Sequence, residues 1–198
     1  EFLADCEALK AAGITPISVG EGDKWPGMHI WAYLVLRVGG PEAFAAAADL
    51  SDARTGSFED EAFVQAGYEL MKLVDAGYFQ EGFLGATHDE MNATFGNGLA
   101  AMELGGQWSP SVQAANSADL AGVANMGMFN FPVVEGGAGQ ATDLIGGGNG
   151  FAIGKDAEPE AIDFVKYLTS VENQTVIAAS NTGIPVAKGA EVGLVDPN

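Results

Sequence analysis

The sequence has few basic residues: 8 Lys and Arg stand against 27 Asp and Glu, so the formal net charge of the 198-residue chain is −19. Binding to nucleic acid or to an anionic membrane surface needs clustered cations, and this balance argues against both. The acidic residues are scattered along the chain, as is typical of a solvated surface. We therefore expect no nucleic-acid partner.

Cysteine and long hydrophobic runs are scarce as well. Cys6 is the one cysteine, which excludes an intrachain disulfide and a thiolate zinc site. Its apolar neighbours at helical spacing predict a buried thiol. No apolar run is long enough to span a membrane, and the sequence shows neither a starting methionine nor a signal peptide. Because the chain opens inside a helical pattern and stops after a short apolar run, we expect it to be a fragment of a longer protein.

The chain does contain strand-like segments that alternate with helix-like ones, which predicts an α/β fold. Helices are expected over residues 1–12, 23–38, 41–50, 57–76, 87–95, 110–115, 158–168 and 172–180. Strands are expected over residues 14–19, 99–104 and 126–131, around the glycines of 144–154, and over 184–186.

Several local signals make these expectations specific. Capping boxes are predicted at Ser57–Asp60 and Thr87–Glu90, and Asp23 is predicted to cap the helix that follows it. The aromatic-rich loop 78–85 is interpreted as packing against the core. In the helix over 158–168, the predicted buried side consists of Ile162, Phe164, Val165 and Leu168.

The sequence lacks the common catalytic signatures. Ser18 lies in Pro16-Ile-Ser-Val-Gly20, where a nucleophile elbow needs glycine in place of proline. Residues 146–151 lack the last glycine of a dinucleotide loop, and no Gly-Lys-Ser/Thr phosphate loop is present. His29 and His88 form no paired metal motif, and the acids form no calcium loop. We therefore assign no metal, no cofactor and no catalytic residue, although 27 acids leave paired carboxylates for glycoside hydrolysis open.

Aromatic and amide side chains gather on loops at predicted strand ends: Trp25 with Asp23 and Lys24, Trp108 with Gln107, and Asn149 among glycines. This chemistry suits neutral sugars, because the C–H face of a pyranose packs on an indole while amides and charged groups bond its hydroxyls. Two plainer interpretations stay open. Trp108 could plug the top of the core, and the glycines at 146–148 could form a hinge between lobes.

A series of motifs extends this pattern along almost the whole chain. The most specific is Phe95-x-Asn-Gly-x-Ala-Ala-Met-x-x-x-Gly-x-Trp108. The others are residues 1–17, Trp25 with Gly39-Gly40, Phe131-Pro132, Gly147-Gly148 with Phe151-Ala-Ile153, Glu160–Gln174, and Gly183-Ile-Pro-Val186. In this order they resemble the extracellular solute-binding proteins of carbohydrate ABC transporters, the maltose-binding-protein-like group.

The resemblance implies a fold of the periplasmic-binding-protein type II kind, in which two lobes of mixed sheets flanked by helices close on a ligand. The chain would cover this fold only in part. Residues 1–144 would form most of the second, C-terminal lobe, and residues 145–198 the crossing strand and a returning segment of the first, N-terminal lobe.

The function implied by the resemblance is non-catalytic binding of a sugar or oligosaccharide in an interlobe cleft, followed by delivery to the permease subunits of an ABC importer. By the same resemblance we expect a monomeric protein, extracellular or periplasmic, anchored to the membrane as a lipoprotein. Three alternatives stay open: a glycan-active hydrolase that uses paired carboxylates, a binding protein for a non-sugar solute, and a sensor or adhesion module.

The resemblance also implies roles for single residues. Trp108 matches a tryptophan that commonly stacks on sugar, the loop with Trp25 often contributes a second aromatic, and Gly148 and Asn149 lie where the crossing strand often borders the cleft. Four further ligand-binding residues are predicted from their proximity to these: Asp23, Lys24, Gln107 and His29.

Overall fold

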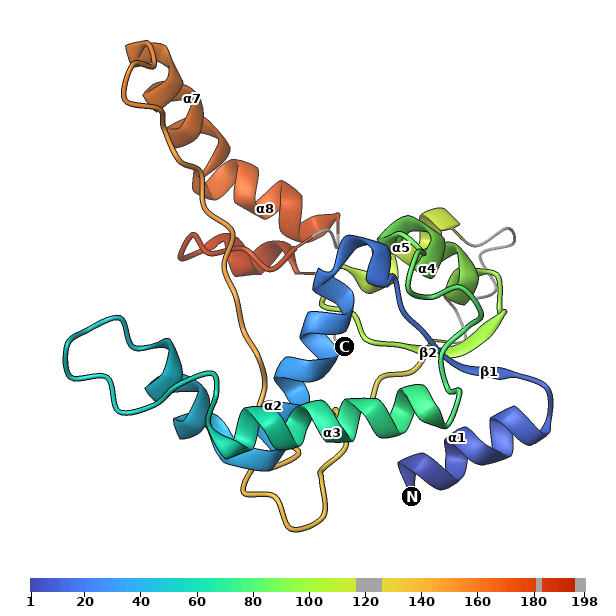
Figure 1. Cartoon of the computed structure of the whole chain (residues 1–198). Helices are drawn as coiled ribbons and strands as arrows, with labels where there is room; N and C mark the ends of the chain where they lie inside the picture. The colour runs from blue at the N-terminus through green and yellow to red at the C-terminus, as the bar shows by residue number, and fades with distance from the viewer. Residues whose placement is uncertain (117–125, 181–182, 195–198) are drawn as a thin grey trace. The chain divides into compact units, whose positions relative to one another are not determined.

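The computed structural model describes residues 1–116, 126–180 and 183–194 (Figure 1). Its helices and strands are α1 (Phe2–Ala11), β1 (Thr15–Ser18), η1 (Glu21–Asp23), α2 (Trp25–Ala48), α3 (Glu61–Asp75), α4 (His88–Gly96), β2 (Ala100–Glu103), α5 (Ser109–Asn116), α7 (Pro159–Leu168), α8 (Val171–Ala179) and η2 (Ala190–Gly193). They fall into two compact units: unit 1 is Glu1–Leu104 with Asn116–Gly146, and unit 2 is Gly105–Ala115 with Gly147–Asn198. This helix-rich α/β architecture confirms the predicted fold class.

The sheet of unit 1 is built from two short parallel strands. β1 and β2 lie side by side, with Thr15 opposite Ala100 and Ile17 opposite Met102 (Figure 1). On the other side of β1, the N–H of Ile17 donates to the carbonyl of Tyr78 over 3.0 Å. The side-chain amide of Gln80 then donates to the Val19 carbonyl over 2.7 Å and accepts from the Val19 N–H over 2.9 Å. A side chain therefore completes the backbone bonding where β1 ends.

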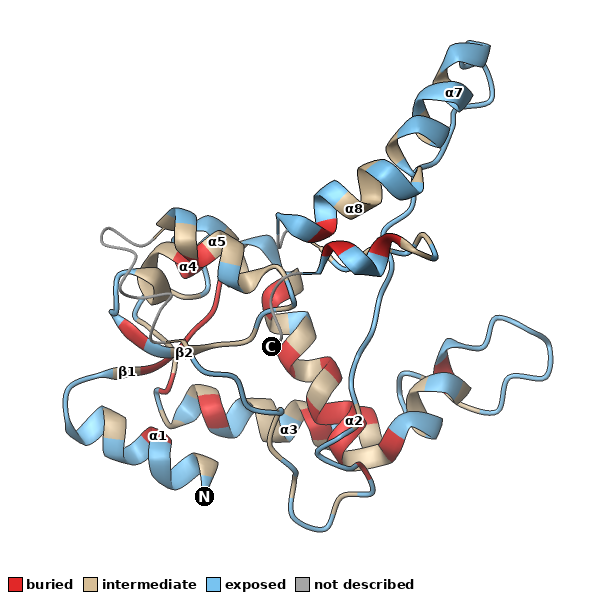
Figure 2. Cartoon of the chain, turned by 180° about the vertical axis from the view of Figure 1, so that it is seen from behind, coloured by how far each residue is buried: buried red, intermediate tan, exposed pale blue. Residues whose placement is uncertain are grey.

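The core of unit 1 lies where α2 and α3 pack together against β1, and Figure 2 shows buried residues on all three elements. It contains Ile17 and Val19 of β1, Ile30, Leu34 and Val35 of α2, and Phe63, Ala66 and Leu73 of α3, with Cys6 and Tyr78 beside them. Cys6 is fully buried, as predicted, and burial, with Asp5 and Glu7 nearby, raises the pKa of its thiol to about 11. Loop 78–85 packs onto this core as expected, through Phe79 and Phe83.

Helix α2 contains the break predicted from Gly39-Gly40-Pro41. Gly40 has φ 76° and ψ 173°, so the helix is interrupted there and resumes with Pro41. The predicted end of the first helix is confirmed as well, since Gly13 takes φ 77° just after α1. In the part of the chain that the structure describes, no helix combines the length and the apolar character that a membrane crossing requires.

One of the two predicted capping boxes is confirmed and the other is wrong. At α4, the N–H of Glu90 donates to Thr87 Oγ1 over 3.2 Å, and the N–H of Thr87 donates to Glu90 Oε2 over 2.7 Å. At α3 the N-cap is Asp60, not Ser57, because Asp60 has an extended backbone with ψ 154°. Its carboxylate reaches back to accept the Ser57 N–H over 2.8 Å. Only one of the two side-chain hydrogen bonds of a capping box therefore forms, and it lies one turn before the helix.

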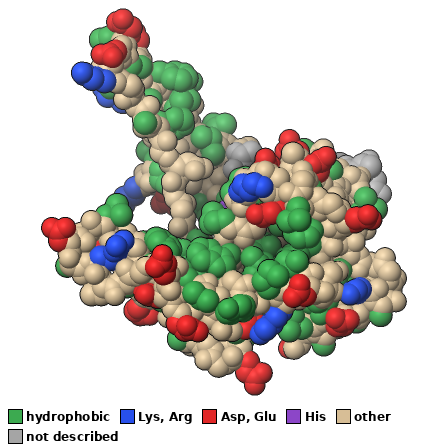
Figure 3. Space-filling view, in the orientation of Figure 1, with side chains coloured by type: hydrophobic (Ala, Val, Ile, Leu, Met, Phe, Trp, Pro, Cys, Tyr) green, Lys and Arg blue, Asp and Glu red, His purple; other side chains and the backbone are tan. Residues whose placement is uncertain are grey.

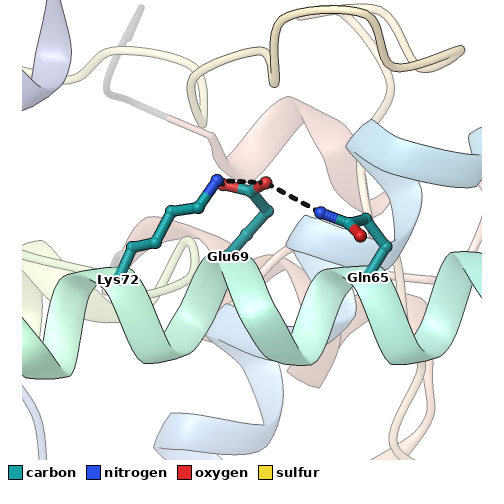
Figure 4. Close-up of polar contacts among 3 residues, drawn as sticks. All are labelled: Gln65, Glu69 and Lys72. Carbon is teal, nitrogen blue, oxygen red and sulfur yellow. Dashed lines mark hydrogen bonds and ion pairs between the residues drawn. The ribbon is translucent and has the colours of Figure 1, made fainter.

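One flank of α3 has a small polar network, drawn in Figure 4. Glu69 accepts a hydrogen bond from Gln65 over 3.2 Å and forms an ion pair with Lys72 over 2.7 Å. The three residues are spaced four and three apart, so they share one side of the helix. On the same helix Phe63, Ala66 and Leu73 face the core.

A buried guanidinium ties α2 to a segment without regular structure. Arg37 is 0% exposed, and its side chain donates to the carbonyls of Phe131, Pro132, Ala141 and Asp143 over 3.0–3.3 Å. Burial lowers the pKa of the guanidinium, and Asp143 opposes this effect. The buried charge thus has carbonyl acceptors for its N–H groups and the Asp143 carboxylate nearby.

Aromatic rings and glycines complete this junction, which we call the Arg37 clamp (Arg37 with residues 131–143). Tyr33 stacks on Phe131 with ring centroids 5.0 Å apart, and the guanidinium lies 5.6 Å from the Tyr33 centroid. A Cβ on Gly137 or Gly139 would overlap the carbonyls of Arg37 and Leu36. Glycine is needed at both positions because the two backbones approach so closely.

Unit 2 contains short helices with little common core. Helix α8 packs on η2, where Ala178 and Ala190 are buried. The predicted buried side of α7 is wrong: the helix has no buried residue, with Ile162 45% and Phe164 60% exposed, and Val165 and Leu168 only half-buried. Figures 2 and 3 show this exposure and the hydrophobic side chains along α7. No described element of unit 2 covers that side of the helix.

Three predicted strands do not form, at 126–131, 144–154 and 184–186, where the described residues have no regular structure. An apolar pattern gives a strand only where a neighbour supplies hydrogen-bond partners, and in the described residues only β1 and β2 pair as a sheet. Met128 is 91% exposed, and the segment after it is held by Arg37 instead.

We expect Arg37→Met to lower the free energy of unfolding of the complete gene product by about 3–5 kcal/mol, because several carbonyls lose their shared donor together. Urea unfolding followed by circular dichroism measures this change. Arg54→Met is the matched control, since Arg54 is exposed and its replacement should change stability by less than about 0.5 kcal/mol. Equal stability of the two variants would contradict the clamp.

Alkaline stability should depend on Tyr78, whose hydroxyl donates to Glu7 Oε1 over 2.7 Å. This hydrogen bond, with burial and nearby negative charge, raises the pKa of Tyr78 to about 12. Since the folded pKa exceeds the unfolded one of about 10, the stabilisation is complete below pH ~10 and is lost as the pH rises towards ~12. Between pH ~10 and ~12, the free energy of unfolding should fall less steeply in Tyr78→Phe than in wild type. Tyr68→Phe is the control: Tyr68 is exposed, so this variant should follow the wild-type curve.

Candidate functional site

Two helices of unit 1 each place a pair of side chains into one cluster. Trp25 and His29 come from the first turns of α2, and His88 and Asn92 from the first turns of α4. Each pair is four residues apart, so its members lie on the same side of their helix. We call these four residues the Trp25 cluster. Trp25 is the first residue of α2, inside the helix expected over 23–38 and not on the strand-end loop before it.

The rings of the cluster are in contact without being parallel. The centroids of Trp25 and His88 are 4.5 Å apart with an interplanar angle of 49°, and those of Trp25 and His29 are 5.3 Å apart at 67°. All three rings are half-buried, whereas Asn92 is buried. The Nδ2 atom of Asn92 lies 3.2 Å from each ring nitrogen of His88. The cluster therefore offers partly exposed aromatic surface with nitrogen donors and acceptors beside it.

Asp23 holds the two helices together. Its Oδ2 atom accepts the backbone N–H of His88, the first residue of α4, over 2.6 Å. The prediction that Asp23 caps the following helix is wrong, because the N-cap of α2 is Lys24, which makes no side-chain cap bond. The carboxylate instead meets the positive end of α4, where negative charge is stabilised. Lys24 turns the chain with φ 70°, a backbone conformation that non-glycine residues rarely adopt.

Two glycines let the loop after β1 pack directly on the loop before α4. The N–H of Gly22 donates to the Ala86 carbonyl over 2.8 Å. A Cβ on Gly20 would lie 2.5 Å from the Thr87 carbonyl oxygen, and one on Gly22 would lie 2.7 Å from that of Gly85. Such contacts leave no room for a side chain. The position of the Trp25 cluster is thus set by backbone packing as well as by Asp23.

The other predicted tryptophan, Trp108, belongs to unit 2 and precedes α5. It is half-buried, and its indole lies so close to Gly106 that a Cβ there would overlap the ring. The turn is closed by the N–H of Ser109, which donates to the Gly106 carbonyl over 2.9 Å, and Ser111 Oγ donates to the Trp108 carbonyl over 2.8 Å. Gln107 is exposed. Glycine thus opens the space that the indole occupies.

Gly148 and Asn149 lie in an exposed segment of unit 2 without regular structure. Nothing lies within 4 Å of a Cβ built on any of Gly146, Gly147, Gly148 or Gly150. These glycines therefore form no close backbone cradle within the described residues. Trp25, His29, Lys24 and Asp23 thus belong to unit 1, and Trp108, Gln107, Gly148 and Asn149 belong to unit 2.

A surface depression of about 320 Å³ in unit 1 lies between the loop after α3 and helix α4. It is lined by Gln80, Glu81, Gly82, Gly85, Ala86, Glu90 and Thr94. None of the predicted site residues lines it, and Glu90 is already engaged in the α4 capping box. In the part of the chain that the structure describes, no group of three His, Cys, Asp or Glu is arranged to hold a metal ion.

His88 and Asn92 were not among the predicted site residues, although a signal for them existed. The Thr87–Glu90 capping box places His88 in the first turn of a helix, and helical spacing then puts Asn92 beside it. Nothing local shows that Asp23, 65 residues earlier, accepts the His88 N–H. That contact depends on the tertiary structure.

Comparisons with known proteins agree with this fold. The family model described as bacterial extracellular solute-binding protein matches residues 1–175. A comparison with curated proteins finds no match.

Two solved structures are similar in sequence and fold. One, from work on xylan utilisation by the thermophilic bacterium Caldanaerobius polysaccharolyticus, is 31% identical with TM-score 0.82, and the match covers 99% of this chain and 50% of that one. A chitin oligosaccharide binding protein is 30% identical with TM-score 0.80, over 96% of this chain and 47% of that one.

A third structure, the solute-binding protein RafE in complex with raffinose, is 20% identical with TM-score 0.62 and supports the fold alone; the match covers 95% of this chain and 48% of that one. The chain thus spans about half the length of the three solved structures.

Replacing Asp23 tests its role at the start of α4. We expect Asp23→Ala to lower the free energy of unfolding by about 0.5–2 kcal/mol, as removal of a capping side chain does, and to speed hydrogen exchange at the His88 amide. Asp23→Asn keeps a hydrogen-bond acceptor and should therefore lose less stability. Asp52→Ala, at an exposed position, is the control. Unchanged exchange at His88 in Asp23→Ala would show that the contact does not hold the helix.

Proposed function

The chain belongs to the bacterial extracellular solute-binding protein family, and from this premise we propose that it binds a sugar or oligosaccharide without catalysis and delivers it to the permease subunits of an ABC importer. The observation that carries the proposal is the family match together with two relatives at 30% identity or more, one from work on xylan utilisation and one that binds chitin oligosaccharide. Xylan and chitin are both polymers of pyranose rings. An oligosaccharide is therefore the ligand class that we favour.

The chemistry of the Trp25 cluster supports this class. A half-buried indole offers an apolar face to the C–H side of a pyranose, and imidazole and amide nitrogens can bond its hydroxyls. In this proposal Trp25 and Trp108 each stack on a sugar ring. Lys24, His29 and Gln107 bond hydroxyls, and Gly148 and Asn149 border the ligand. Asp23 contributes by holding the start of α4 in place.

We further propose the lobe assignment made from the sequence. Residues 1–144 form most of one lobe, and residues 145–198 cross to the other. A sugar bound in the cleft between lobes would then be enclosed as the lobes close. The family is extracellular; a lipoprotein anchor and a monomeric state belong to the proposal.

Calorimetric titration of the complete gene product tests the function. The panel contains monosaccharides, xylo-oligosaccharides and chito-oligosaccharides, and each mixture is analysed afterwards for cleaved products. We expect one class to bind tightly and to be recovered intact. Cleavage that is abolished by one Asp or Glu substitution would instead support a glycan hydrolase. If no sugar in the panel binds, the ligand is instead a non-sugar solute.

The two tryptophans give the sharpest test of the site. We expect Trp108→Ala and Trp25→Ala each to weaken binding of the sugar found in the panel by about 1–3 kcal/mol, because a stacked aromatic contact is lost. Isothermal titration of each variant measures the change.

Trp31→Phe is the control for both variants. The Trp31 indole packs on Phe63 and donates to its carbonyl within unit 1, so this replacement should leave the affinity unchanged. Wild-type affinity in Trp108→Ala or Trp25→Ala would remove that residue from the site.

A further inference from the structure

We propose that His88 is a ligand-contacting, specificity-determining residue, whose imidazole and the Trp25 indole recognise the same pyranose ring. The inference rests on the proposed function and adds a residue that neither the sequence motifs nor the comparisons single out. It assigns His88 a hydrogen bond to a hydroxyl of the ring that stacks on Trp25.

The ring geometry leaves both aromatic surfaces within reach of one ligand. A centroid distance of 4.5 Å is close contact, yet the interplanar angle of 49° means that the two ring planes diverge. Parallel rings at this distance would cover each other. Both side chains are half-buried, so part of each ring is accessible. A pyranose on the exposed indole surface would therefore have its rim next to the imidazole.

Among the residues that the structure describes, the imidazole has hydrogen-bonding capacity that no protein group takes up. In a neutral imidazole one nitrogen donates and the other accepts. Within the described residues the side-chain amide of Asn92 is the one polar partner at either ring nitrogen, with its Nδ2 atom 3.2 Å from both. One amide N–H satisfies only the accepting nitrogen. If the amide is turned over, its oxygen satisfies only the donating one. In either case one ring nitrogen is left for a ligand.

The position of the imidazole is fixed from three directions. Asp23 accepts the His88 N–H over 2.6 Å, the Thr87–Glu90 capping box sets the start of α4, and Asn92, which is 3% exposed, holds the ring from the next turn. A group held in this way loses little conformational entropy when it binds. A hydroxyl meets a preformed partner, which is the condition for discriminating between sugars that differ at that hydroxyl.

The test separates hydrogen bonding from ring packing by two replacements of the same residue. His88→Phe keeps an aromatic ring against Trp25 and removes both nitrogens, whereas His88→Gln keeps a donor and an acceptor and removes the ring. We titrate the complete gene product with xylotetraose and chitotetraose by calorimetry. His88→Phe should bind the preferred sugar about 5–20-fold more weakly, as expected for a lost hydrogen bond, and His88→Gln should stay within about threefold of wild type.

Asp89→Asn is the control, because Asp89 is the exposed neighbour of His88 in the same turn and should bind as wild type does. Unfolding midpoints of all variants show whether each is folded. Wild-type affinity in His88→Phe, with Trp25→Ala still impaired, would overturn the role of His88 and leave the proposed function intact. Equal losses in His88→Phe and His88→Gln would also overturn it, since a side chain that keeps a donor and an acceptor would then bind no better than one that has neither. If wild type binds neither these two sugars nor any other member of the panel, the proposed function fails and the inference fails with it.

Discussion

The structure of unit 1 depends on a cation that has been taken out of water. A buried guanidinium needs acceptors for its N–H groups, and Arg37 finds them in the carbonyls of residues 131–143. Those carbonyls belong to a segment without regular structure, so the Arg37 side chain donates the hydrogen bonds that a neighbouring strand would otherwise donate. The helix that carries Arg37 also carries Trp25 and His29 at its start. One element thus connects the candidate site to the stretch that leaves unit 1 at Gly146.

The sequence allowed prediction of the features that depend on neighbouring residues alone. The capping box at Thr87–Glu90 and the breaks at Gly13 and Gly40 follow from backbone chemistry within one or two turns, and the structure has all three. The predicted strands at 126–131 and 144–154 fail for the opposite reason. Strand formation needs a partner from elsewhere, and an alternating pattern cannot say whether that partner exists. The exposed side of α7 is the same kind of error.

In the candidate site, too, the sequence predicts what neighbouring residues determine but not what tertiary contacts determine. The aromatic residues and their loops could be identified from residue type, and helical spacing was sufficient to pair His88 with Asn92. The hydrogen bond between Asp23 and His88 could not be predicted, because these residues are 65 positions apart and meet only in the folded chain. The carboxylate of Asp23 could cap the helix next to it or a distant one. The distant helix is favoured because Gly20 and Gly22 bring that helix's first turn into hydrogen-bonding range.

The charge of the chain bears on the class of sugar. Arg37 is buried in its clamp, Lys72 and Lys166 form ion pairs with Glu69 and Asp163, and Lys10 donates to a backbone carbonyl. Among the proposed ligand-binding residues, Lys24 is the one cation. Anionic sugars such as uronic acids need arginine or lysine for their carboxylates, and they would approach a chain with formal charge −19 against repulsion. Indole and imidazole surfaces with an amide beside them suit neutral pyranoses, whose recognition needs hydrogen bonds and stacking rather than charge.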